Sequence, residues 1–228
     1  MPLMPLGAAL ADLVLPVACA GCGAEHVPLR YGACAACVAE LEALRPHPAA
    51  PTPPPPGMPP CLAVGPYAGA LRGVLLAYKE RGRHRLARPL GALLAAAIAG
   101  VARDRRRAVL VVPVPSTGRA ARARHGDHMA RLATHAVRRL RAGGWQAEVV
   151  QPLRVTTRPD SAALDAAGRL AVAESSLRIR TRHRVPRREP AIRRTLVVVD
   201  DIVTTGATLA AVATRLREAN MQVTGAAV

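Results

Sequence analysis

The sequence predicts an α/β domain whose parallel sheet is flanked by helices, with a small four-cysteine module at the N-terminus. Two runs of apolar, mostly β-branched residues, 109–112 and 196–199, have the composition of strands that are buried on both faces. Ala-rich stretches of helical periodicity alternate with these runs, as in folds built on parallel sheets. Two Cys-x-x-Cys pairs near the N-terminus, before a Pro-rich stretch, mark the separate module.

The composition allows a sizeable core but restricts what builds it. Half of the 228 residues are apolar, yet Phe is absent and aromatic residues make up only 2%. The core must therefore consist of Ala, Val and Leu. The formal net charge of +17 favours polyanionic partners such as nucleic acid or phosphorylated ligands. An Arg-rich solvated surface, which a GC-rich genome also produces, explains the same charge, and both interpretations stay open.

Composition shifts divide the chain into three parts. Residues 1–45 hold a short helix and the cysteine module, residues 46–60 are a Pro-rich, extended linker, and residues 61–228 form the main domain. No segment is judged long and apolar enough to span a membrane, and segment 1–19 lacks the basic start of a secretion signal. We therefore expect a cytoplasmic protein without membrane insertion.

Four cysteines have the spacing of a metal site. Cys19 and Cys22, then Cys34 and Cys37, form Cys-x2-Cys-x11-Cys-x2-Cys, which brings four thiolates to one point, as tetrahedral zinc requires. Four Cys ligands leave no open coordination position, so the zinc would be structural. Two disulfides or free thiols are the alternatives, and a reducing cytoplasm disfavours the disulfides. Cys61 stands alone and is expected to be a small buried apolar residue.

The stretch 196–209 places two acids and a Thr-rich turn after a predicted strand. Asp200 and Asp201 stand where the strand ends, and ligands bind at the carboxyl ends of strands in open α/β sheets. The turn opens a helix, so its N–H groups and the positive end of the helix dipole suit a phosphate. Paired carboxylates beside it can accept hydrogen bonds from a sugar cis-diol or help hold a divalent cation. The pattern predicts a sugar-phosphate site.

A second predicted strand end carries positive charge. The run 109–112 leads into Pro-Val-Pro-Ser-Thr-Gly and a basic loop over 118–128, at the same edge of a parallel sheet as Asp200. Pyrophosphate needs backbone N–H groups and basic side chains, and this loop supplies both. A merely exposed basic loop is the alternative. His125 and His128 are expected to be positioned loop residues rather than metal ligands.

Lys79 and Arg81 lie near the C-terminal end of a helix that is expected from about Ala70 to Lys79. One interpretation is a basic group placed near phosphates. The other is favourable charge at a helix C-terminus. The sequence does not decide between them.

Residues 196–208 resemble the phosphoribosyl-pyrophosphate (PRPP) motif of type I phosphoribosyltransferases. That motif is an apolar strand, two acids, two apolar residues, then Thr/Ser, Thr/Ser, Gly, any residue and Thr/Ser, and each position is met here. The whole chain resembles the ComF-type family of competence-associated phosphoribosyltransferase-like proteins. That resemblance rests on this motif, the paired cysteines, the Tyr-Lys-x-x-Gly stretch at 78–82 and the Val-Pro-Val-Pro strand end.

The resemblance implies a type I phosphoribosyltransferase-like fold and assigns roles to residues. Asp200 and Asp201 would bind the ribose 2′- and 3′-hydroxyls as the catalytic residues, and Mg²⁺ would bridge pyrophosphate and ribose oxygens. The 5′-phosphate would be held by Thr204, Thr205, Gly206, Ala207 and Thr208. The pyrophosphate would face Pro115, Ser116, Thr117, Arg119, Arg124 and Lys79.

Two functions are consistent with this resemblance. The first is an enzyme, linked to DNA uptake, that transfers phosphoribosyl from PRPP to a nitrogenous acceptor. The second is a non-catalytic PRPP-sensing or DNA-uptake module that docks a helicase-like partner or single-stranded DNA. Departures from the family pattern motivate the second, because Ser161 and Val172 stand where the family has a Gln and an Asn expected to touch substrate.

Overall fold

The computed structural model of the protein describes residues 18–123, 126–156, 166–180 and 194–228. The chain divides into two compact units. One contains the chain up to Leu44 together with Tyr67–Leu86, and the other contains Arg45–Pro66 together with Ala87–Val228. The unit that holds the cysteine module therefore also includes the helix that follows Tyr67.

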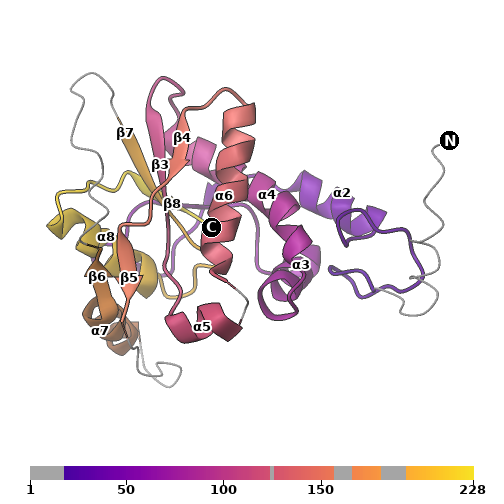
Figure 1. The fold of residues 1–228 in the computed structure, drawn as a ribbon, viewed down its shortest axis with the longest axis horizontal. Helices are drawn as coiled ribbons and strands as arrows, with labels where there is room; N and C mark the ends of the chain where they lie inside the picture. The colour runs from indigo at the N-terminus through magenta and orange to yellow at the C-terminus, as the bar shows by residue number, and fades with distance from the viewer. Residues whose placement is uncertain (1–17, 124–125, 157–165, 181–193) are drawn as a thin grey trace. The chain divides into compact units, whose positions relative to one another are not determined.

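A six-stranded sheet forms the centre of the second unit (Figure 1). In spatial order its strands are β1 (His47–Pro48), β2 (Cys61–Ala63), β8 (Gly225–Ala227), β7 (Arg194–Val199), β3 (Ala108–Pro113) and β4 (Ala147–Val149). All neighbouring strands are parallel except β1 and β2. The predicted α/β class with a mostly parallel sheet is confirmed, and the two apolar runs form its central strands.

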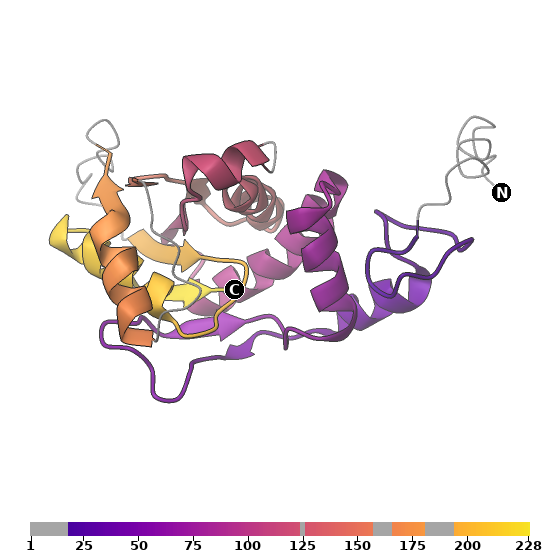
Figure 2. The ribbon, with the colours of Figure 1, turned by 90° about the horizontal axis from the view of Figure 1, so that it is seen from below.

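Helices pack on both faces of this sheet (Figure 2). Helices α4 (Ala87–Ala102) and α6 (His128–Ala142) pack against each other and against the strands on one face. On the other face, α8 (Ala207–Glu218) joins alternate residues of β3 and β7 in a single apolar core. Beside α8 lie α7 (Ala166–Ser176) and an antiparallel pair, β5 (Leu153–Val155) with β6 (Leu177–Ile179).

The central strands are buried because both faces are covered. Val109 and Val111 of β3, like Val197 to Val199 of β7, have no exposed surface. β-Branched side chains on a pleated strand fill such a double-sided core well. A protein without Phe thus builds its core from Val, Leu and Ala, as the composition predicts.

The first unit consists of the cysteine module, α2 (Ala35–Ala43), α3 (Gly69–Glu80) and a 3-10 turn, η1 (His84–Leu86). Glu40 on α2 accepts a hydrogen bond from the backbone N–H of Ala70 at 2.9 Å, which satisfies a donor in the first turn of α3. A Cβ at Gly73 would meet the backbone of Gly21. Only Gly lets α3 approach the cysteine module this closely.

The Pro-rich stretch 46–60, predicted as a linker, is hydrogen-bonded into the second unit. It contains β1, and its last residue, Pro60, accepts a hydrogen bond from the N–H of Ala226 at 2.8 Å. Arg217 on α8 donates to the carbonyl of Gly57 at 2.5 Å. This stretch therefore packs along α8 as part of the sheet unit.

One segment of the described chain, His84–Ala102, is long and apolar enough to cross a membrane, and half of it is buried. The expectation that no segment is long and apolar enough to span a membrane is therefore wrong by the criteria of length and composition. Leu90, Leu94 and Ile98 of α4 are buried, and α4 packs against α6 and the sheet. A core helix of a folded domain meets the same criteria.

Close packing of α4 against α6 depends on Gly91. A Cβ at this position would lie 2.5 Å from the Cβ of His135 and 3.0 Å from the backbone N of Ala136. We expect Gly91→Ala to lower the free energy of unfolding by about 1–3 kcal/mol, since it overpacks a rigid contact. Urea unfolding measures the change.

Gly100→Ala on the same helix is the matched control. Its Cβ would meet only the Cδ1 methyl of Leu62, the far end of a flexible side chain. Better helix propensity, about 1 kcal/mol, should offset that contact. If Gly91→Ala and Gly100→Ala lowered the free energy of unfolding equally, that result would contradict a tight contact between α4 and α6.

Candidate functional site

Two strand ends lie side by side at the carboxyl edge of the sheet. In the parallel pairing of β3 and β7, Pro113 is opposite Val199, and the N–H of Val114 donates to the carbonyl of Val199 at 2.9 Å. The loop after β3 and the loop after β7 therefore leave the sheet together. This edge is where open α/β sheets place ligands, and the structure brings the residues after Pro113 near Asp200.

The two acids are held differently. Asp200 accepts a hydrogen bond from the N–H of Asp201 at 2.9 Å, so its carboxylate turns back on the chain. Oδ2 of Asp201 lies 3.5 Å from Nε2 of His128, and both side chains are about nine-tenths buried.

Burial, and secondarily the charge of Asp200, raises the pKa of the Cys61 thiol on β2 to about 11. Cys61 is thus neutral and buried, as predicted.

The turn after the acids leads directly into α8. Gly206 is the residue before the helix and has a left-handed backbone, with φ of 72°. The predicted phosphate-binding residues, Thr204, Thr205, Gly206, Ala207 and Thr208, therefore form the approach and first turn of a twelve-residue helix. The first N–H groups of an α-helix lack partners within the helix and carry a partial positive charge, which suits an anion.

Gly206 also meets a packing requirement. A Cβ here would lie 2.5 Å from Sδ of Met58 and 3.2 Å from Cδ of Pro55. The Pro-rich stretch thus packs against the start of α8. Gly206 is needed both for its positive φ and for this contact, whatever the turn binds.

The loop after β3 is fixed to the N-terminus of α6. Asp127 caps α6 by accepting from the N–H groups of Met129 at 3.0 Å and Ala130 at 3.1 Å. The same carboxylate lies 3.2 Å from Oγ of Ser116 and 3.4 Å from its N. Nδ1 of His128 lies 3.3 Å from Oγ of Ser116. One of the predicted pyrophosphate residues is thereby tied to α6.

The other residues predicted to face pyrophosphate are spread over the fold. Pro115 and Thr117 lie in the same loop as Ser116, and Thr117 accepts from the N–H of Ala120 at 3.2 Å to cap α5 (Gly118–Ala123). Arg119 is exposed on α5. Arg124 lies outside the described residues, and Lys79 belongs to the other unit. Their roles in binding stay predictions.

The contact between His128 and Asp201 was not foreseen from the sequence. His128 was expected to be a positioned loop residue, and the structure places it in the first turn of α6, where its ring faces Ser116 and Asp201. The sequence does carry a signal for the position of His128, though none for its partner Asp201. Asp127 is a good N-cap residue at the start of an amphipathic stretch, which places His128 in the first turn of a helix beside the β3 loop.

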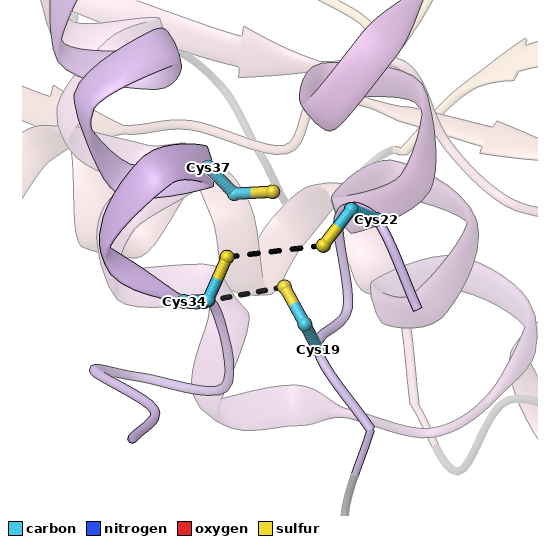
Figure 3. A group of neighbouring side chains, drawn as sticks. All are labelled: Cys19, Cys22, Cys34 and Cys37. Carbon is cyan, nitrogen blue, oxygen red and sulfur yellow. Dashed lines mark hydrogen bonds between the residues drawn. The ribbon is translucent and has the colours of Figure 1, made fainter. Parts of the chain in front are cut away.

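The four cysteines converge in the first unit (Figure 3). The Sγ atoms of Cys19, Cys22, Cys34 and Cys37 all lie within 4.8 Å of one another. Tetrahedral zinc with Zn–S bonds of about 2.3 Å separates its sulfurs by about 3.8 Å. The Sγ atoms of Cys22 and Cys34 are 3.8 Å apart. None of the five cysteines forms a disulfide in this structure, so a bound metal and free thiols are the alternatives that stay open.

Electrostatics within the cluster favour a bound cation. Burial raises the pKa of Cys19, but backbone hydrogen bonds from Cys22, Cys34 and Gly21 outweigh it and lower the pKa to about 6. Burial, then the neighbouring thiols, raises the pKa of Cys37 far above its usual value. One thiolate forms readily, and its charge hinders the next. A divalent ion removes that repulsion, so the donor set fits a thiophilic metal.

Comparison with known proteins adds no assignment. No protein-family model matches this chain, and no curated protein matches its sequence.

We expect the reduced protein to bind one equivalent of Co²⁺ with the absorption bands of tetrahedral thiolate coordination. Cys22→Ser should weaken binding by at least about tenfold, because it removes a ligand. Cys22 is exposed, so this change disturbs packing least. Cys61→Ser is the control and should leave the spectrum unchanged. Absorption bands that change in Cys61→Ser, or the absence of such bands when Co²⁺ is added to the reduced wild-type protein, would contradict the four-thiolate site.

Gly206→Ala should lower the free energy of unfolding by about 1–3 kcal/mol for the positive φ alone, and further for the contact with Met58. Gly144→Ala is the matched control, because Gly144 has a φ of 80° with nothing near its Cβ position. Thermal unfolding of both variants isolates the packing contribution. A smaller loss at Gly206 than at Gly144 would show that Met58 does not restrict this turn.

Proposed function

We propose that the chain binds PRPP with Mg²⁺ at the carboxyl edge of its sheet and transfers the phosphoribosyl group to a nitrogenous acceptor. The observation that carries this proposal is the placement of Asp200 and Asp201. They follow a central parallel strand, precede the N-terminus of α8, and lie beside the loop after β3. A phosphate at the helix start and a cis-diol at the acids would match this order of groups.

The chain's own residues would orient the sugar and stabilise the leaving group. The first-turn N–H groups of α8 and the hydroxyls of Thr204, Thr205 and Thr208 would hold the 5′-phosphate. Asp200 and Asp201 would accept hydrogen bonds from the ribose hydroxyls. Ser116 and Thr117, with Arg119 and Arg124, would face the pyrophosphate. Mg²⁺, when bound, neutralises phosphate charge.

In the proposed reaction, the bond from the anomeric carbon to pyrophosphate breaks as a nitrogen of the acceptor bonds to that carbon. Positive charge develops on the sugar ring in an oxocarbenium-like state, and pyrophosphate leaves with the bonding electrons. The acceptor nitrogen then loses its proton to solvent. Orientation and charge stabilisation would therefore supply most of the rate enhancement.

The cysteine cluster would have a structural role in this protein. Four Cys ligands leave no coordination position for a substrate, so a bound zinc would stabilise the first unit rather than take part in the transfer. The four-cysteine cluster is consistent with the zinc module that the resemblance implies, and the link to DNA uptake rests on that resemblance alone. A PRPP-sensing module without turnover is separated from the enzyme by whether any base or amine releases pyrophosphate.

Calorimetric titration tests the proposal. Wild-type protein should bind PRPP only with Mg²⁺, and the double change Asp200→Asn with Asp201→Asn should weaken binding by at least about 100-fold, because hydrogen bonds to charged acceptors are worth about 1.5–3 kcal/mol each. Asp104→Asn is the surface control for the loss of a carboxylate, since Asp104 lies in an exposed turn before β3. Equal affinities for all three proteins, or no binding by folded wild type, would refute the proposal.

A further inference from the structure

A chain of polar contacts crosses the carboxyl edge of the sheet. It runs from Asp201 after β7, through His128 at the start of α6, to Ser116 after β3. Asp127 completes it, because its carboxylate holds both Ser116 and the first turn of α6. These contacts join the loop after β7 to the loop after β3 and the start of α6, and the parallel pairing of β3 and β7 alone does not fix their side chains.

The two acids differ in what orients them. The backbone N–H of Asp201 holds the carboxylate of Asp200, so that group is fixed locally. The carboxylate of Asp201 faces an imidazole from another element, at 3.5 Å between Oδ2 and Nε2. That distance is within reach of an ion pair and long for a hydrogen bond. A small movement on ligand binding would shorten it, as is common at sites that close on their ligands.

Burial strengthens the contact between His128 and Asp201. The His128 side chain is 10% exposed and that of Asp201 is 11% exposed, so water competes little for either group. Polar contacts in such surroundings are stronger than on the surface. Nδ1 of His128 is engaged at the same time by Ser116, at 3.3 Å from Oγ. The imidazole therefore lies between Ser116 and Asp201, with Nδ1 at hydrogen-bond distance from Oγ of Ser116 and Nε2 facing the carboxylate of Asp201 at 3.5 Å.

We infer that His128 is a positioning residue that holds the Asp201 carboxylate in the orientation that accepts the ribose hydroxyls and couples it to the loop that faces pyrophosphate. The inference rests on the proposed function for its substrate. The contact between His128 and Asp201 does not depend on the substrate, because the structure itself contains it. His128 touches Asp201 and Ser116 and would act through them, and it would not take part in the bond exchange.

The matched variants are His128→Ala, which removes the contact, and His128→Gln, whose side-chain amide reaches about as far and can still donate. Thr134→Ala controls for changes to α6, because Thr134 is exposed there and bonds only within the helix. With Mg²⁺, His128→Ala should weaken PRPP binding at least tenfold, and His128→Gln should stay within about threefold of wild type. Thr134→Ala should bind as wild type.

A double-mutant cycle separates positioning from a general effect on folding. If His128 acts through Asp201, then His128→Ala should cost little further in a protein that already carries Asp201→Asn. If His128→Ala and Asp201→Asn instead weaken PRPP binding independently, so that their fold-losses in affinity multiply, the inference is overturned. Equal losses of PRPP affinity in folded His128→Ala and His128→Gln proteins would overturn it too. Wild-type affinity in His128→Ala would overturn it as well.

A measurement without PRPP keeps this inference distinct from the proposed function. In long-range ¹H–¹⁵N spectra, the Nε2 resonance of His128 should shift in Asp201→Asn and stay in place in Asp104→Asn. No shift in a protein that binds PRPP would overturn the positioning role. A clear shift in a protein that binds no PRPP would refute the proposed substrate and leave the His128–Asp201 contact standing.

Discussion

The parallel pairing of β3 with β7 is the constraint on which the rest of the structure depends. It buries two Val-rich strands on both faces, so helices must cover each side of the sheet. It also makes the chain leave both strands at one edge. Asp200 and the loop that contains Ser116 meet there because their strands share a register.

The absence of Phe shapes how this core is built. Small side chains fill little volume, so helices must approach the sheet and each other closely. Gly91 lets α4 approach α6, and Gly206 lets the Pro-rich stretch approach α8. Polar groups in so tight a fold need fixed partners. Asp127 and His128, both at the start of α6, supply such partners to Ser116 and Asp201.

Sequence patterns predicted the features that depend on local composition. The apolar runs identified β3 and β7, helical periodicity identified α3, and Cys spacing identified the cluster in Figure 3. The contact of His128 with Asp201 was not predicted, because partners in different elements leave no local pattern. The stretch 46–60 was predicted as extended, but proline content cannot tell what an extended chain packs against. The positions of Ser161 and Arg124 lie outside the described residues.

The most direct test of the central claim is a crystal structure of the protein with PRPP and Mg²⁺. The 5′-phosphate should lie at the first turn of α8, the ribose hydroxyls on Asp200 and Asp201, and the pyrophosphate against the loop that contains Ser116. PRPP bound elsewhere on the chain, or an edge of the sheet that stays empty at saturating PRPP, would refute the proposed site.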